Sequence, residues 1–281
     1  MTTAERGVIY ISWGEAAAYG VEMSVKSLWA LDPSLPVLVV GDDIAAQRFA
    51  DRPGFTVYRD EVDPFESNWL YGFLAGRVKP RLAALSPFAQ TLYVDADTVF
   101  KISPAFGFDL LDRWDMIVVE ADERSLLTVL PENRPEVSQT IAELGTAQIL
   151  YHNSGVFFWR RNAVTVRLFE LWSEEWLRFH MWDEQVALLR ALMRSEALFL
   201  NVPYTWNCRD MKKTFMVFHR FGSMAVRQFR GSKGAVARGL PMGRPLVEVE
   251  LAPGRFVKVH VGDEEKAVEN FRQATGSRRA M

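Results

Sequence analysis

The sequence predicts an α/β fold in which helices flank a mostly parallel central sheet. Over the first 60 residues, short apolar runs alternate with segments of helical periodicity. This alternation is typical of parallel strands joined by helical crossovers. A later apolar run is interrupted by two carboxylates, Asp95 and Asp97, which suggests a buried strand that ends at a polar site. The chain has 281 residues, of which 49% are hydrophobic, so it can form one large core.

The first part of the chain contains the elements of a β-α-β-α-β unit. Each expected strand is a run of apolar or β-branched residues, and the helices repeat their apolar residues every three or four positions. Gly14 and Gly20 lie near the turn after the first strand, and Pro33 ends the helix that follows. The expected order is strand 7–12, helix 21–31, strand 36–40, helix 44–50, strand 55–58 and helix 77–85.

The second part contains further strands and helices, followed by a less regular tail. The expected elements are strands 92–100, 116–119 and 155–159, a polar loop at 130–136, and helices 164–178 and 183–193. The tail is richer in glycine and basic residues than the rest. We expect residues 1–204 to form the core and residues 205–281 to complete the same domain as a C-terminal segment.

Composition gives an expectation about the cellular setting. No uncharged apolar run reaches the roughly 18 residues that a membrane span needs. The first six residues, MTTAER, lack the basic and apolar segments of a signal peptide. The single cysteine, Cys208, cannot form an intrachain disulfide. A reducing, cytoplasmic location is therefore expected.

Asp95 and Asp97 are the strongest candidates for a metal site. The run before them is apolar, and buried carboxylates are costly unless a positive charge pairs with them. Because side chains alternate along a strand, we expect both carboxylates on the same side. Their hard oxygens suit Mn²⁺ or Mg²⁺, and a cation at the carboxyl end of a parallel strand can hold a diphosphate. The alternative is a pair of solvated carboxylates that caps a strand.

Six motifs occur in an order that resembles a known family. They are Ile11-Ser12-Trp13-Gly14, Arg77-Val78-Lys79-Pro80-Arg81, Leu92-Tyr93-Val94-Asp95-Ala96-Asp97, Asn153-Ser154-Gly155-Val156, Trp182-Asp183-Glu184-Gln185 and His260-Val261-Gly262. The set resembles nucleotide-sugar-dependent glycosyltransferases of the Rossmann-like GT-A fold, especially the glycogenin- and galactosyltransferase-like branch. The resemblance implies an enzyme that moves a hexose from a UDP-sugar to an acceptor hydroxyl, with a leaning towards retention.

The resemblance implies a third metal ligand near the end of the chain. Asp95 and Asp97 would bind Mn²⁺ or Mg²⁺, and His260, which follows an apolar run, would complete the set. The branch usually carries a His-x-x-Gly-x-x-Lys motif there. In this chain Gly262 follows His260 after one intervening residue, and Lys266 lies four residues further on.

The resemblance also implies contacts with the nucleotide. Lys79 would reach the diphosphate, with Arg77 and Arg81 as neighbouring cations that could instead lie on a solvated helix face. Asp42 and Asp43 end the second strand, where they would bind ribose hydroxyls or form a turn. The further candidate donor contacts are Ile11, Ser12, Trp13, Tyr19, Ala96, Gly262 and Lys266, among which Trp13 or Tyr19 would stack on the base or serve in packing.

Three polar residues are candidates for the chemistry at the sugar. Asn153 would contact sugar hydroxyls, unless it serves only the turn before a strand. Asp183 or Glu184 would lie beside the anomeric carbon, and the alternative is that they cap a helix. In an inverting enzyme one of them would deprotonate the acceptor. In a retaining enzyme it would orient the sugar and stabilise an oxocarbenium-like transition state.

A basic segment at 209–244 is a candidate for contact with an anion. It carries nine cations and one carboxylate, a net charge of +8 in a chain whose formal net charge is −2. Phenylalanines interrupt the cations, as in some nucleic-acid grooves, so the acceptor could be a hydroxylated DNA base. The alternatives are a solvated loop or a lid over the diphosphate. The acceptor hydroxyl is expected to enter near Trp206, Asn207 and this basic segment. The cations are Arg209, Lys212, Lys213, Arg220, Arg227, Arg230, Lys233, Arg238 and Arg244.

Two other functions fit parts of the pattern. A sugar nucleotidyltransferase of similar fold usually has a glycine-rich loop and a basic residue after its first strand, and Ser12-Trp13-Gly14-Glu15 lacks that basic character. A non-enzymatic polyanion-binding module would use the basic segment and leave the acidic pair without a function. Its binding would fall steeply with salt and would not respond to Mn²⁺.

Overall fold

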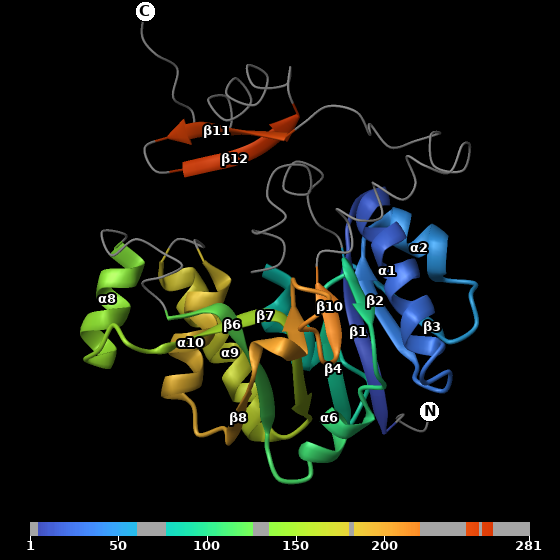
Figure 1. Cartoon of the computed structure of the whole chain (residues 1–281), viewed down its shortest axis with the longest axis horizontal. Helices are drawn as coiled ribbons and strands as arrows, with labels where there is room; N and C mark the ends of the chain where they lie inside the picture. Colours follow the sequence, from blue (N-terminus) through green and yellow to red (C-terminus); the bar gives the residue numbers. More distant parts are fainter. Residues whose placement is uncertain are drawn as a thin grey trace, which may run out of the picture.

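A computed structural model describes the backbone of residues 5–60, 77–125, 135–179, 183–219, 246–252 and 255–260. Its main feature is a seven-stranded sheet in the order β3-β2-β1-β4-β7-β6-β8 (Figure 1). The pairs of β1 with β2 and β4, of β2 with β3 and of β6 with β8 are parallel, whereas β7 runs antiparallel to β4 and β6. The predicted α/β fold with a mostly parallel sheet is confirmed.

The strands of this sheet coincide with the apolar runs of the sequence. The bounds are β1 (Arg6–Ser12), β2 (Val37–Gly41), β3 (Phe55–Arg59), β4 (Gln90–Val94), β6 (Met116–Ser125), β7 (Leu150–Arg160) and β8 (Phe199–Val202). The helices are α1 (Gly14–Trp29), α2 (Asp43–Phe49), α5 (Leu82–Leu85), α6 (Ala105–Leu110), α8 (Pro135–Leu144), α9 (Ala163–Arg178) and α10 (Glu184–Arg194).

The core has two main parts, one on each face of the sheet. Strand β1 shows this arrangement, because its side chains alternate between the faces. Val8 and Tyr10 belong to the cluster that includes α1, α2 and α6, whereas Ile9 and Ile11 belong to the cluster that includes α9 and α10. The sheet is therefore buried on both sides, as expected where helices cover both faces.

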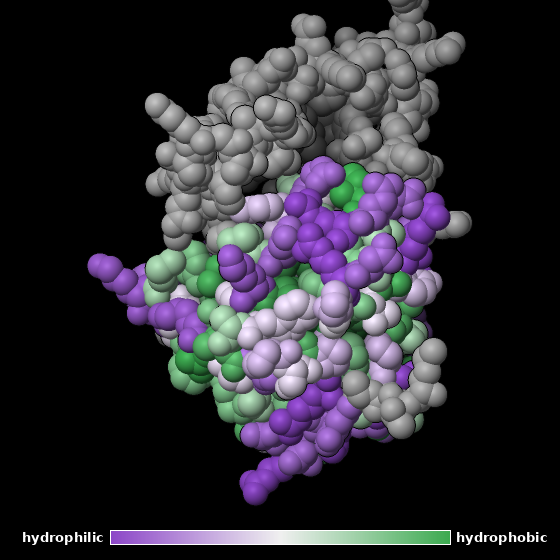
Figure 2. Space-filling model, turned by 90° about the vertical axis from the view of Figure 1, so that its right-hand side faces the viewer, coloured by the Kyte–Doolittle hydropathy of each residue, from purple (hydrophilic) through white to green (hydrophobic). Residues whose placement is uncertain are grey.

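The outer face of α1 and α2 is hydrophilic. Figure 2 looks onto this side of the molecule and shows hydrophilic residues gathered in its upper and lower parts, with paler and hydrophobic residues between them. Arg48 pairs with Glu15 and Glu22, and Arg52 pairs with Glu22. Exposed ion pairs of this kind each contribute about 0–1 kcal/mol, so this face serves as a solvated surface of the fold.

A second, three-stranded sheet brings distant parts of the chain together. It has the order β5-β10-β9, with β5 (Thr98–Phe100), β10 (Val217–His219) and β9 (Asn207–Cys208). In this sheet His219 pairs with Thr98, and Val217 pairs with Asn207. The pairing places the end of β10 beside the segment that leaves β4.

Three sequence expectations about elements are wrong. Residues 92–100 do not form one strand, because β4 ends at Val94 and β5 joins the other sheet, with a Thr98 Oγ1 hydrogen bond to the Asp95 carbonyl closing the turn (2.8 Å). Helix α1 begins at Gly14 rather than 21, since the alanines at 16–18 favour helix. Pro135 begins helix α8 inside the expected loop, because proline is tolerated in a helix's first turn.

The C-terminal part of the chain is described only as a hairpin. Strands β11 (Leu246–Ala252) and β12 (Arg255–His260) pair antiparallel, with a register irregularity between Glu250 and Ala252. The expected division into a core at 1–204 and a completing segment at 205–281 therefore stays a prediction. None of the described helices combines the length and apolar character required to cross a membrane.

A buried histidine on β7 gives a testable pH dependence. The His152 side chain is buried and bonds Asn201 through Nε2 (2.6 Å), and burial lowers its pKa from 6.5 to about 4. The unfolded chain therefore binds more protons between these values, so stability rises with pH across that window by about 3 kcal/mol. Denaturant unfolding at pH 7 and at pH 4.5 measures this loss. His152→Gln, which cannot ionise, is expected to reduce the pH dependence, and an unchanged slope would contradict the assignment.

Candidate functional site

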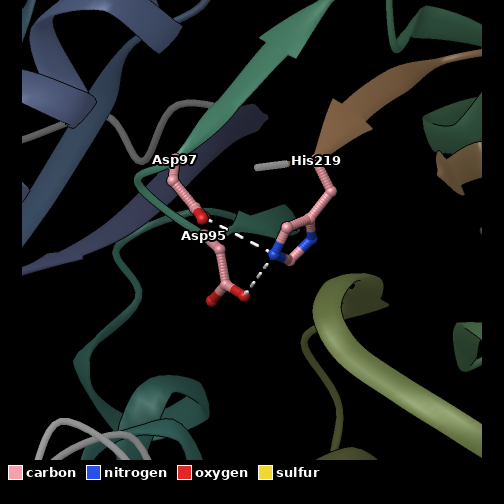
Figure 3. A group of neighbouring side chains, drawn as sticks. All are labelled: Asp95, Asp97 and His219. Atoms are coloured by element: carbon pink, nitrogen blue, oxygen red, sulfur yellow. Dashed lines mark ion pairs between the residues drawn. The ribbon is translucent and has the colours of Figure 1, made fainter. Parts of the chain in front are cut away.

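The turn between β4 and β5 and the end of β10 together form a group of three possible metal ligands. Asp95 and Asp97 lie in the turn, and His219 is the last residue of β10. His219 Nε2 lies 3.5 Å from Asp97 Oδ1 and 4.0 Å from Asp95 Oδ2, and one ligand atom from each residue lies within 4.8 Å of the others. Figure 3 shows the imidazole facing both carboxylates.

The charges of this group fit a divalent cation. Burial raises the pKa of Asp97, and the neighbouring Asp95 carboxylate raises it further, although His219 opposes both effects. Two carboxylate oxygens and one imidazole nitrogen are donors that Mn²⁺ and Mg²⁺ accept. A cation bound between them would therefore relieve the repulsion that Asp97 experiences.

Protein groups bind Oδ1 of Asp95, the carboxylate oxygen that does not face His219. Burial would raise the pKa of Asp95, but the Lys79 charge, then His219 and a hydrogen bond from Tyr93, outweigh burial and lower it. The Tyr93 hydroxyl donates to Asp95 Oδ1 at 2.6 Å, and Lys79 Nζ lies 3.4 Å from the same oxygen. Because Oδ1 is engaged in this way, Oδ2 is the Asp95 oxygen that faces His219.

Lys79 lies in a buried ion cluster. It begins the short 3-10 helix η1 (Lys79–Arg81), and its side chain is 4% exposed. Its Nζ contacts Ser154 Oγ at 3.0 Å and Glu184 Oε1 at 3.3 Å, besides Asp95. The expected contact of Lys79 with a diphosphate stays a prediction. Arg81, one of its two neighbouring cations, bonds Asp60.

Glu184 and Asp183 have different surroundings. Asp183 caps α10 by accepting from the backbone of Gln185 and Val186, which is the helix-capping alternative. Glu184 instead enters the Lys79 cluster, where its Oε1 accepts from the Ser154 hydroxyl at 2.6 Å. Burial raises the pKa of Glu184, and its buried Oε2 has no hydrogen-bond partner among the residues that the structure describes. Glu184 therefore has an unused acceptor oxygen beside the metal-ligand group.

Asn153 lies next to the same group on β7. Its Oδ1 accepts from the backbone of Gly155 at 2.7 Å and from Asn207 Nδ2 at 2.9 Å. The side-chain oxygen of Asn153 is therefore occupied by protein groups. A contact of Asn153 with sugar hydroxyls stays a prediction, and its Nδ2 is the side-chain atom that could make this contact.

The ends of β1 and β2 form the expected nucleotide side of the site. Ile11, Ser12 and Trp13 are buried, and the Ser12 hydroxyl has no hydrogen-bond partner among the described residues. Asp42 caps α2 by accepting from Ala45 N, and it also accepts from Gly14 N. These bonds correspond to the expected turn role of Asp42 rather than to ribose binding. Exposed Asp43 pairs with Arg59, Tyr19 lies on α1, and buried Ala96 lies between the two site carboxylates.

Sequence reasoning missed His219 as a possible metal ligand. The chain reads His219-x-x-Gly222, which is the first half of the motif that was assigned to His260. Ala225 stands where that motif has its lysine. The side chain of His260 and residues Gly262 and Lys266 lie outside the described part of the chain, so their expected roles stay predictions.

The absence of a side chain at Gly155 is required for this arrangement. A Cβ there would lie 2.5 Å from Asp95 Oδ2 and 3.0 Å from Asn207 Nδ2. Gly155→Ala is therefore expected to displace Asp95 and to weaken Mn²⁺ binding about tenfold or more, as measured by electron paramagnetic resonance of free Mn²⁺. Gly145→Ala is the control, because Gly145 has a φ of 72° and an added Cβ would meet no described residue within 4 Å other than its chain neighbours. It should cost stability without changing Mn²⁺ affinity, and equal Mn²⁺ affinities in both variants would contradict the prediction.

The basic segment is described only as far as His219. Arg209, Lys212 and Lys213 are exposed in the turn before β10, where Lys212 and Lys213 contact Asp210. The remaining cations of the segment lie outside the described residues. No observation on the described part supports contact with a nucleic acid.

The chain is similar to solved glycosyltransferase structures. The galactosyltransferase LgtC, solved with donor and acceptor sugar analogues, shares 17% identity at a TM-score of 0.54, over 83% of this chain and 98% of LgtC. Mouse xyloside xylosyltransferase 1 in its apo form shares 14% identity at a TM-score of 0.50, over 77% of this chain and 97% of the mouse protein. No protein-family profile and no curated protein sequence matches the chain. At these identities the likeness establishes the fold, and it confirms the expected GT-A architecture.

Proposed function

We propose that the chain is a metal-dependent glycosyltransferase that moves a hexose from a UDP-sugar to an acceptor hydroxyl. The observation that carries the proposal is the convergence of Asp95, Asp97 and His219 where β4 ends. Open α/β sheets bind their ligands outside the carboxyl ends of the strands. The similar structures are named as a galactosyltransferase and a xylosyltransferase, which supports the same reaction class.

The metal ligands in this proposal are Asp95, Asp97 and His219. A divalent cation, Mn²⁺ or Mg²⁺, supplies positive charge that neutralises the departing diphosphate when it is bound. We assign the third ligand to His219 because its Nε2 already faces both carboxylates. Lys79 balances the charge of Asp95 and Glu184 from within the protein, and its charge lowers the pKa of Asp95.

The nucleotide in this proposal lies at the ends of β1 and β2. The buried Ser12 hydroxyl has no partner in the described part of the chain, and unpartnered buried polar groups are rare in folded proteins. A uridine or ribose oxygen is a suitable partner for this hydroxyl. Ile11 and Trp13 provide the apolar surroundings that a base requires.

The sugar in this proposal lies beside Glu184. Its Oε2, which no described residue bonds, accepts a hydrogen bond from a sugar hydroxyl, while Ser154 and Lys79 hold Oε1. We propose retention, following the leaning of the resembling branch. Under retention Glu184 orients the sugar and its negative charge stabilises the positive charge that develops at the anomeric carbon. Under inversion Glu184 or Asp183 would instead take the proton of the acceptor hydroxyl.

Release of nucleotide from a panel of sugar donors tests the proposal. The protein is incubated with UDP- and GDP-hexoses and Mn²⁺, with and without EDTA, and free UDP and GDP are measured. We expect UDP release from one UDP-hexose that stops when EDTA removes the metal. UDP release that continues at the same rate in the presence of EDTA would contradict metal dependence. Pyrophosphate formed from UTP and a sugar phosphate would instead identify a nucleotidyltransferase.

A further inference from the structure

A chain of three hydrogen bonds runs from the backbone of β7 to His219. The Gly155 N–H donates to Asn153 Oδ1 (2.7 Å), and Asn207 Nδ2 donates to the same oxygen (2.9 Å). Asn207 Oδ1 lies 2.9 Å from His219 Nδ1. His219 Nε2, at the opposite side of the ring, faces Asp95 and Asp97.

The Gly155 N–H fixes the direction of all three hydrogen bonds. A backbone N–H can only donate, so the Asn153 atom beside it is the amide oxygen. The Asn207 atom that meets this oxygen must then be the NH₂ group, which leaves Asn207 Oδ1 towards the imidazole. An amide oxygen only accepts, and His219 Nδ1 must therefore carry a proton. In the neutral ring, Nε2 then has the lone pair that a metal needs.

We propose that Asn207 is a positioning residue that holds His219 in its Nδ1–H tautomer and thereby sets the affinity of the site for a divalent cation. The inference rests on the proposed function, since it takes the Asp95, Asp97 and His219 group as the metal site. Partners that bond the second nitrogen of a ligating histidine fix its tautomer and ring orientation.

The surroundings of Asn207 keep it in place. Asn207 lies on β9, which pairs in parallel with β10, so Asn207 and His219 lie on adjacent strands. Asn207 is 2% exposed, and water therefore cannot easily replace its bonds. Gly155 leaves room for it, because a Cβ at that position would lie 3.0 Å from Asn207 Nδ2.

A second histidine–asparagine pair in the structure provides a matched control. His152 Nε2 bonds Asn201 Oδ1 at 2.6 Å, and no carboxylate of the described residues forms an ion pair with this ring. Asn201→Ala removes the same kind of bond from a histidine outside the metal-ligand group. This variant measures how the loss of a histidine–asparagine hydrogen bond changes folding stability when the metal-ligand group is intact.

Titration with Mn²⁺, followed by electron paramagnetic resonance of the free ion, tests the inference. Asn207→Ala is expected to weaken Mn²⁺ binding about 10- to 100-fold, whereas Asn201→Ala leaves it within about twofold of wild type. Asn207→Asp keeps an acceptor for Nδ1–H but loses the donor to Asn153 Oδ1, so it is expected to recover only part of the affinity. If Asn207→Ala binds Mn²⁺ with wild-type affinity, the inference is overturned but the proposed function is not. A wild-type protein that binds no Mn²⁺ would overturn the proposed function as well.

The tautomer itself is observed by ¹⁵N NMR of the protein labelled on its four histidines. At alkaline pH without metal, the His219 ring is expected to show a protonated Nδ1 and an unprotonated Nε2, assigned by comparison with His219→Gln. Asn207→Ala is expected to lose this preference while its circular dichroism and melting curve stay cooperative. A wild-type ring protonated at Nε2 would overturn the inference, and this result does not require Asn207→Ala to fold.

Discussion

Asp97→Asn is expected to reduce sugar transfer about 1000-fold while the protein keeps its fold. The substitution preserves the shape of the side chain but removes a negative oxygen that faces His219 Nε2 at 3.5 Å. A metal contributes several kcal/mol to stabilising the departing group, and about 4 kcal/mol corresponds to this factor in rate. The Asp97 side chain is 44% exposed, so its replacement should cost little folding stability.

Steady-state UDP release with saturating Mn²⁺ and donor measures this effect. Asp109→Asn is the matched control, because Asp109 is an exposed carboxylate on α6 that pairs with Arg6. Its turnover should stay within about twofold of wild type, as expected for an exposed ion pair. Turnover of Asp97→Asn at the wild-type rate would show that Asp97 does not hold the metal.

Arg190→Met is expected to produce the largest loss of stability, about 3–5 kcal/mol. The Arg190 side chain is 1% exposed and joins α10 to α9 and α8 through Glu175 and Glu136. It also donates to Thr140 Oγ1 at 2.8 Å, and its guanidinium lies 4.2 Å from the centre of the Phe179 ring. Removing the cation leaves two buried carboxylates without their shared partner, and that is the source of the cost.

Urea unfolding at pH 7 compares Arg190→Met with a neighbouring variant. Arg194→Ala removes a cation that also pairs with Glu175, but Arg194 is 51% exposed. Its replacement is expected to cost less than about 1 kcal/mol. Equal losses in the two variants would show that burial of the ion pair does not determine its contribution.

Apart from the start of α1, the elements of the first 60 residues could be predicted closely because their pattern is local. The expected strand 36–40 and helix 44–50 correspond to Val37–Gly41 and Asp43–Phe49. Each is a short apolar or periodic run between clear turn residues, and each strand is buried by adjacent helices. Local composition therefore determines these elements.

The turn that holds the carboxylates could not be predicted in the same way. Thr98, Val99 and Phe100 continue the apolar pattern of β4, but they pair with β10, more than 100 residues later in the chain. That pairing leaves no local signal. The two carboxylates converge because the chain turns after Val94, and not because side chains alternate along one strand.

The choice between two histidines shows the same limit. Apolar residues precede both His219 and His260, and each histidine is the last residue of a strand. The glycine three residues after His219 was the one sequence signal that favoured it. The contacts of Lys79 with Glu184, and of Asn153 with Asn207, join residues that are far apart in sequence, so only the fold reveals them.

The position of a bound metal tests the proposed function most directly. Crystals grown with Mn²⁺ and UDP, measured at a wavelength where manganese scatters anomalously, locate the ion. We expect one strong anomalous peak among Asp95 Oδ2, Asp97 Oδ1 and His219 Nε2, in contact with the diphosphate. A peak elsewhere, or a diphosphate bound away from these three residues, would contradict the proposal.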